Sequence, residues 1–253
     1  MKFTKAKCQL DKILDNLNPQ DFIDADPISI PKRFKTKEDI EISAFFAATL
    51  AWGQRKTIIN NTNKLMHWMG EEPYDFIVNH IPSDLKVFEK FVHRTFNATD
   101  VLYFIEVLKQ WYKDKKSLED FFMGETMKDK ISNFHTAFFD NSFVSQRTKK
   151  HVANPSKNSS AKRLNMYLRW MVRQDGLDFG IWDSISSREL KCPLDVHVQR
   201  AAFHFGLLTR KQQDWKAVEE LSENLLLMDS EDPIKYDLAL FKWSEGKMQL
   251  ESK

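Results

Sequence analysis

The stretch Pro193-Leu194-Asp195-Val196-His197-Val198 is a short acidic turn that opens a helix. Aspartate is a favoured N-cap residue, because its carboxylate accepts hydrogen bonds from backbone N–H groups of the first turn. The apolar residues that follow have the spacing of one buried helix face: Val198, Ala201, Ala202 and Phe205. Asp195 is therefore predicted to cap this helix, to face a functional surface, or both, because one oxygen can cap while the other points elsewhere.

A second helix is predicted over residues 160–173, and its Lys162 lies thirty-three residues upstream of Asp195. Its apolar face is formed by Leu164, Tyr167, Leu168 and Met171. Ser160 is the expected N-cap, which places Lys162 in the first turn. A cation there is unfavourable for the helix dipole. The position fits a functional lysine, and it also fits a lysine that points into water.

Lys162 and Asp195 are the candidate catalytic residues. A neutral lysine amine is a nucleophile, but an ordinary lysine is charged at neutral pH. A protein lowers such a pKa by burial or by nearby cations, and Arg163 and the positive helix end both act in this direction. Asp195 could stabilise a cationic sugar or move a proton. We expect the amine and the carboxylate to lie within several ångströms of each other.

Composition excludes several classes of protein. The chain has 253 residues, of which 42% are hydrophobic and 29% charged, as in an ordinary globular protein. Only two cysteines, Cys8 and Cys192, are present, so a four-cysteine metal or iron–sulfur site is not possible. No apolar signal core and no run of 18 apolar residues occur. We expect a cytoplasmic protein with no membrane span, no metal and no cofactor.

Charge is unevenly distributed although the net charge is only +2. Residues 141–174 contain no Asp or Glu but eight cations: Arg147, Lys149, Lys150, Lys157, Lys162, Arg163, Arg169 and Arg173. Such a stretch is typical of a surface that meets phosphates. It is also typical of a solvated basic loop, and both interpretations remain open.

Hydrophobic spacing predicts an all-α fold. Further helices are expected over residues 7–17, 38–52, 55–69, 73–79, 83–91, 100–113, 126–139, 214–227 and 233–243. The helix over 38–52 is apolar nearly all round, so it is expected to be buried. We expect two lobes, one over 37–141 and one formed by 1–36 with 142–253.

The segment Pro193 to Arg200 resembles the Pro-Val-Asp-Thr/Val-His element of the helix-hairpin-helix DNA glycosylases, a superfamily that includes endonuclease III and the 8-oxoguanine glycosylases. Residues 161–165 resemble the lysine-bearing helix start of the archaeal 8-oxoguanine glycosylases. Leu50-Ala51-Trp52-Gly53-Gln54 resembles an element in which a glutamine faces the DNA lesion. The whole chain also resembles a bacterial family that carries only an unknown-function label. The resemblance implies a two-lobed helical fold with Gln54, Lys162 and Asp195 lining a cleft.

Two departures from the glycosylase pattern concern DNA contact. The usual hairpin contains glycines that let backbone N–H groups approach a phosphate, whereas residues 154–160 contain none. Phosphate contact would then come from Lys157, Ser159, Ser160 and the helix N-terminus. The four C-terminal cysteines of endonuclease III are also missing.

The resemblance thus implies base-excision repair. The protein would be a monomer that binds duplex DNA with a damaged or flipped base, with an 8-oxoguanine-type lesion as a candidate and abasic-site lyase activity as an accompaniment. The predicted DNA-binding residues are Gln54, Arg55, Lys149, Lys150, Lys157, Ser159, Ser160, Arg163 and His197. Two alternatives stay open, namely a non-catalytic nucleic-acid-binding protein with this fold and a helical interaction module.

Overall fold

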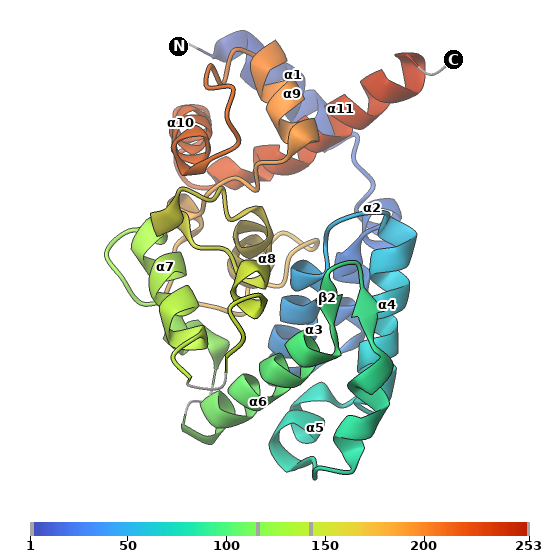
Figure 1. Cartoon of the computed structure of the whole chain (residues 1–253). Coiled ribbons are helices and arrows are strands. Elements are labelled where there is room, and N and C mark those ends of the chain that lie inside the picture. The colour runs from blue at the N-terminus through green and yellow to red at the C-terminus, as the bar shows by residue number, and fades with distance from the viewer. Residues whose placement is uncertain (1–2, 115–116, 142–143, 252–253) are drawn as a thin grey trace. The chain divides into compact units, whose positions relative to one another are not determined.

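The chain is mostly helical, as predicted, in the computed structural model, which describes residues 3–114, 117–141 and 144–251 (Figure 1). Among these residues the strands form a single antiparallel hairpin, β1 (Val92–His93) and β2 (Phe96–Asn97). No helix in the described part of the chain is long and apolar enough to cross a membrane.

Two compact units make up the chain. Unit 1 consists of Met1–Pro19, Thr126–Lys128 and Asn154–Lys253, and unit 2 of Gln20–Glu125 and Asp129–Ala153. Unit 2 is larger than the predicted lobe over 37–141, since it also takes in residues 20–36 and 144–153; residues 142 and 143 lie outside the described residues. Short helices before residue 37 pack on α3, and Arg147 and Thr148 bind Asp100, which explains the wider boundary.

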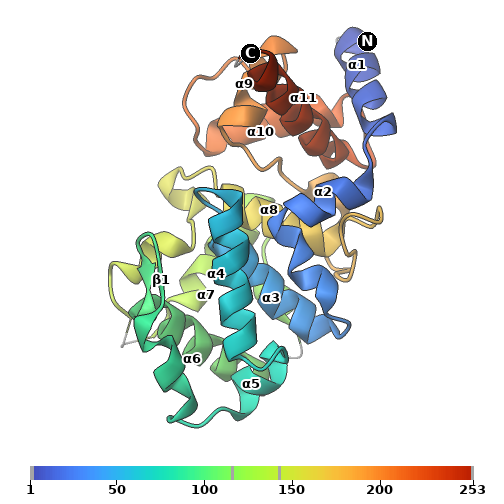
Figure 2. The same cartoon turned by 90° about the vertical axis from the view of Figure 1, so that its right-hand side faces the viewer.

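Unit 2 is built around the buried helix α3 (Lys37–Thr49), beside which α4 (Arg55–Trp68) lies (Figure 2). Thr36 caps α3 by accepting a hydrogen bond from the Asp39 N–H, and every residue from Ile40 to Thr49 is buried, as the sequence predicted. The remaining elements of the unit are α2 (Pro19–Ala25), η1 (Pro27–Ser29), η2 (Pro31–Arg33), α5 (Pro73–Asn79), η3 (Asp84–Lys90), α6 (Ala98–Asp114), η4 (Leu118–Phe121), α7 (Met127–Phe138) and η5 (Thr148–His151).

The core of unit 2 is aromatic. Phenylalanine rings from α3, α6 and α7 pack with centroids 4.7 to 5.8 Å apart: Phe45, Phe104, Phe134 and Phe138. The buried Glu41 carboxylate accepts hydrogen bonds from the Tyr112 hydroxyl, the Ser117 hydroxyl and the Leu118 N–H. These bonds offset the cost of burying its charge.

Unit 1 places α1 (Thr4–Asp15) and α9 (Val196–His204) against α11 (Tyr236–Glu251), as Figure 1 shows. The Tyr236 hydroxyl accepts a hydrogen bond from Lys7 Nζ at 2.7 Å and donates one to Asp11 at 2.9 Å, which fastens α1 to α11. The other elements of unit 1 are η6 (Pro155–Lys157), α8 (Lys162–Val172), η7 (Ser187–Glu189), α10 (Trp215–Leu226) and η8 (Pro233–Lys235).

One local expectation differs from the structure, and two elements were not predicted. The predicted helix over residues 83–91 is the tighter 3-10 helix η3. Helix α2 begins at Pro19, because a proline that stops one helix is also well suited to the first position of the next. The hairpin was not predicted, since its turn holds Arg94 with φ +56° in place of the usual glycine or asparagine.

Candidate functional site

The structure brings together the two candidate catalytic residues. Lys162, the first residue of α8, and Asp195, the N-cap of α9, form an ion pair with 3.0 Å between Nζ and Oδ2. Their side chains are 34% and 16% exposed, so the pair is accessible to a ligand from solvent. The expected distance between amine and carboxylate is therefore confirmed, while their catalytic role stays a prediction.

Asp195 has both of the roles that its position allows. Its Oδ1 accepts hydrogen bonds from the His197 and Val198 N–H groups, each at 2.9 Å, so it caps α9. The second oxygen, Oδ2, bonds to Lys162. The buried side chains of Leu194 and Val198 hold the start of α9 in the core. The carboxylate is thus fixed by the backbone on one side and presented to the amine on the other.

The start of α8 differs from the prediction. The N-cap is Ala161, not Ser160, and it adopts a left-handed conformation with φ +47° and no side-chain cap. The Ser160 carbonyl instead accepts a hydrogen bond from Asn165 Nδ2 at 3.1 Å. Because the chain turns sharply at Ala161, the helix begins one residue later than a serine cap would allow.

The loop before α8 achieves its turns without glycine. Asn158 has φ +62°, and asparagine tolerates this left-handed region better than most residues. Its side chain donates to Asp214 at 3.2 Å, and Ser159 forms a β-bridge with Asp214. The Ser159 hydroxyl accepts a hydrogen bond from the Ala161 N–H at 3.2 Å. Lys157 is exposed, whereas Ser159 and Ser160 are half-buried and form hydrogen bonds with neighbouring residues.

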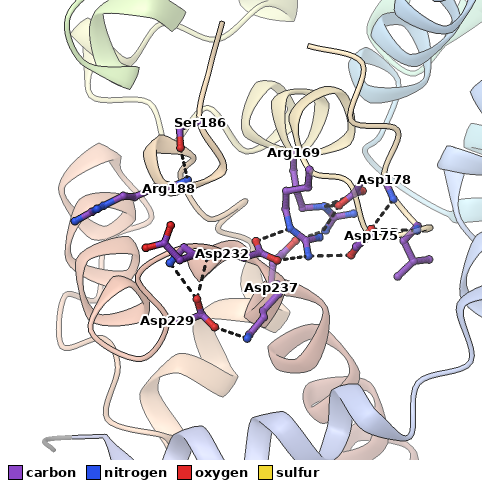
Figure 3. Close-up of polar contacts among 12 residues, drawn as sticks. Arg169, Asp175, Asp178, Ser186, Arg188, Asp229, Asp232 and Asp237 are labelled. Atoms are coloured by element: carbon purple, nitrogen blue, oxygen red, sulfur yellow. Dashed lines mark hydrogen bonds and ion pairs between the residues drawn. The ribbon is translucent and has the colours of Figure 1, made fainter. Parts of the chain in front are cut away.

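A buried ionic network lies further along α8, in the basic stretch for which the sequence predicted either a phosphate-facing surface or a solvated loop (Figure 3). Arg169 contacts Asp178, with 3.3 Å from Nε to Oδ2, and also contacts Asp237. Arg173 contacts Asp178 at 2.6 Å and Asp175 at 2.8 Å. It also binds Asp232 through two bonds of 2.8 Å.

The expectation that both arginines belong to a basic surface is therefore wrong, because each is less than 5% exposed. Their charges are balanced by aspartates that follow the basic stretch in sequence. Burial would lower the pKa of Arg173, but the hydrogen bond to Asp232 and the charges of Asp178 and Asp175 outweigh this effect and raise it. Burial raises the pKa of the Asp178 carboxyl to about 6, although the two guanidiniums act against this.

Asp237 links this network to the segment that carries Asp195. One of its oxygens bonds to Arg169 of α8, and the other accepts from the Cys192 thiol at 3.7 Å. Cys192 is fully buried three residues before Asp195, and burial raises the pKa of its thiol well above the ordinary value. Asp237 thus holds both α8 and the chain leading to Asp195. Sequence reasoning missed it, since a single Asp in a helix gives no signal of such a role.

The other predicted site residues divide between the units. Within unit 1, His197 is half-buried with its ring 5.4 Å from that of Phe241, and Arg163 is half-buried with its pKa lowered to about 10 by burial. Four belong to unit 2: Gln54, Arg55, Lys149 and Lys150. Gln54 is the exposed N-cap of α4 and makes no side-chain capping bond.

Metal ligands do not cluster in the part of the chain that the structure describes. No three His, Cys, Asp or Glu side chains there are grouped so as to hold a metal ion.

Comparison with known proteins gives one match. No curated protein and no solved structure matches the chain. The family model that does match spans residues 26–245 and is described as "Protein of unknown function (DUF2400)". This span includes the Lys162–Asp195 pair, the Asp237 network and nearly all of unit 2. The chain therefore belongs to the DUF2400 family.

Proposed function

We propose that the protein is a DNA glycosylase-like repair enzyme, in which Lys162 is the nucleophile and Asp195 handles charge and protons. The observation that carries the proposal is the 3.0 Å contact between an accessible amine and a carboxylate thirty-three residues apart in sequence. Asp195 is fixed by two backbone hydrogen bonds, so the carboxylate needs little reorganisation to act. The resemblance of the segments around both residues to helix-hairpin-helix glycosylases supports the same chemistry.

The pair supplies the parts that base excision requires. The Lys162 ammonium passes one proton to Asp195 Oδ2, and its freed electron pair attacks C1′ of the sugar. The bond from C1′ to the base breaks, and the electron pair leaves with the base, which takes the proton held by Asp195. The nitrogen, now bound to C1′, passes a proton to the ring oxygen as the ring opens, which leaves a protonated imine. Loss of a proton from C2′ with departure of the 3′ phosphate would then cut the strand.

The base must leave the duplex before this reaction. Flipping costs a few kcal/mol, and least for a poorly paired base. In this proposal Gln54 takes part in the DNA contact, and an 8-oxoguanine-type lesion is the candidate substrate. The glycine-free loop with Lys157, Ser159 and Ser160 is the predicted phosphate contact beside the pair.

Base release from short duplexes tests the proposal. A panel would carry 8-oxoguanine or uracil, for which release of the base is measured, or an abasic site, for which strand cleavage is measured, each under single-turnover conditions with excess protein. Lys162→Arg keeps a cation beside Asp195 but cannot form the imine under these conditions, so we expect it to abolish release. Lys216→Ala removes an exposed lysine of α10 and serves as the control with unchanged release. Equal release by wild type and Lys162→Arg would exclude Lys162 as the nucleophile.

A second candidate is a protein that binds nucleic acid without cutting it. The specific observation in its favour is that each member of the pair already has a structural role, because Asp195 caps α9 and Lys162 ties α8 to it. This candidate predicts salt-sensitive binding and no base release from any duplex of the panel.

A further inference from the structure

Three segments of unit 2 that contain no acidic residue are held against one another. They are residues 51–57, 92–99 and 144–153, which include the turn before α4, the β1–β2 hairpin and η5. Together they carry six Lys or Arg residues and no Asp or Glu: Arg55, Lys56, Arg94, Arg147, Lys149 and Lys150. The fold therefore gathers like charges that are far apart in sequence.

The hairpin packs on the turn before α4. The half-buried Trp52 ring meets the His93 ring edge-on at 4.8 Å and stacks on His151 at 5.9 Å. Gly53 has φ +108°, and a Cβ atom there would lie 2.8 Å from Nη1 of Arg94. The Arg94 guanidinium thus lies directly over the backbone of Gly53, which precedes Arg55 by two residues and Lys56 by three.

Arg147 fastens the hairpin to η5. It donates hydrogen bonds to the Thr95 carbonyl at 2.6 Å and to Asp100 at 2.8 Å. Thr148 donates to the same carboxylate at 2.7 Å. Lys149 and Lys150 follow directly, so the Asp100 contacts hold them next to the hairpin.

Asp100 neutralises only one of these cations. Its carboxylate is fully buried and is used by Arg147, Thr148 and the Asn97 N–H. The exposed Lys56, Arg94 and Lys150 have no acidic partner among the residues that the structure describes. Four of the other cations in these segments are called the hairpin surface: Lys56, Arg94, Lys149 and Lys150.

We infer that the hairpin surface binds the phosphate backbone of DNA, with Arg94 as its principal contact. An exposed arginine at the tip of a two-residue turn can direct its planar fork at phosphate oxygens. Packing of Arg94 against Gly53 and the hydrogen bonds to Asp100 already restrict the conformations of this surface. Binding therefore loses less conformational entropy. The inference rests on the proposed function only in naming DNA as the partner, and it adds a second binding region in unit 2 that needs no catalysis.

The test measures binding of the full-length protein to an undamaged 20-base-pair duplex by fluorescence anisotropy between 50 and 200 mM salt. Each lost phosphate contact lowers the magnitude of the slope of log affinity against log salt concentration by about 0.9. This change corresponds to a loss of affinity on the order of tenfold near 50 mM salt. We expect Arg94→Gln/Lys150→Gln to lower the slope by about 1.8 and to weaken binding to match.

Lys86→Gln/Lys90→Gln is the matched control, because it removes two exposed cations from η3 in the same unit. We expect this control to bind as wild type. Equal binding by the two double variants, or no salt-sensitive binding by the wild type, would overturn the inference. Absence of base release would end the proposed catalysis and leave the binding result intact, so the two failures can be told apart.

Discussion

Residues 141–174 contain no Asp or Glu, and the cations in two parts of this stretch have different surroundings in the fold. On α8 the cations meet aspartates: Lys162 pairs with Asp195, and Arg169 and Arg173 are buried among carboxylates. Around η5, Lys149 and Lys150 remain without an acidic partner among the described residues. The difference lies in what packs against each part, because later segments bring five aspartates to α8, whereas Asp100 at η5 is taken up by Arg147 and its neighbours.

A run of charge in a sequence therefore does not by itself predict a charged surface. Among the described residues, four of the eight cations in residues 141–174 form ion pairs with aspartates 2 to 68 residues away: Arg147, Lys162, Arg169 and Arg173. The part of the run that stays exposed is the part that we assign to DNA. Substitutions on the two sides should accordingly differ in what they damage.

The largest expected effect is on stability, at the buried side of the comparison. Arg169→Met leaves Asp178 and Asp237 buried without this guanidinium, and breaking a buried pair costs about 3–5 kcal/mol. Lys150→Met should change the free energy of unfolding by less than about 0.5 kcal/mol, because it alters an exposed side chain. Urea unfolding of both variants measures the contrast. A loss below about 1 kcal/mol for Arg169→Met would mean that the network contributes little.

Asp100 provides a comparable test in unit 2. Burial would raise the pKa of Asp100, but the His151 ring, whose Nε2 lies 3.3 Å from the carboxylate, and hydrogen bonds from the Asn97 N–H and Thr148 hold it well below the ordinary value of 3.8. Its contribution to stability is therefore complete above pH 3.8 and is lost as the pH falls toward the folded-state pKa.

Asp100→Asn should cost about 1.5–3 kcal/mol at neutral pH, the scale of one hydrogen bond to a charged group. The difference from wild type should shrink as the pH is lowered below 3.8, since the unfolded wild-type chain then takes up a proton. Urea unfolding at a series of pH values measures this. A difference that does not change between pH 7 and pH 3 would contradict the assigned charge.

A smaller effect is expected at the candidate site. Asp195→Ala removes the cap of α9, which costs about 1–2 kcal/mol, whereas Asp195→Asn keeps a capping oxygen and should cost less. Hydrogen exchange of the His197 and Val198 amides separates the two variants, because these N–H groups bond to Asp195. Equal exchange in both variants would show that the cap does not protect them.

The sequence predicted the helices and the candidate pair better than the network that holds the pair. Helical spacing located α3, α5 and α9 closely, and the N-cap rule identified Asp195 correctly. Arg169 and Asp237 could not be recognised, because their pairing depends on how α8 and α11 pack and not on a local pattern. The hairpin was missed for a related reason, since Arg94 adopts a backbone conformation that its residue type rarely takes.

Borohydride trapping on DNA with an abasic site tests most directly whether Lys162 is the nucleophile. Hydride reduces the imine to a stable amine, and mass spectrometry of the digested protein locates the modified lysine. If Lys162 is the nucleophile, we expect an adduct on the peptide that contains Lys162, no such adduct in Lys162→Arg, and an undiminished adduct in Lys216→Ala. An adduct on a different lysine, or one of equal yield in Lys162→Arg, would contradict this role of Lys162.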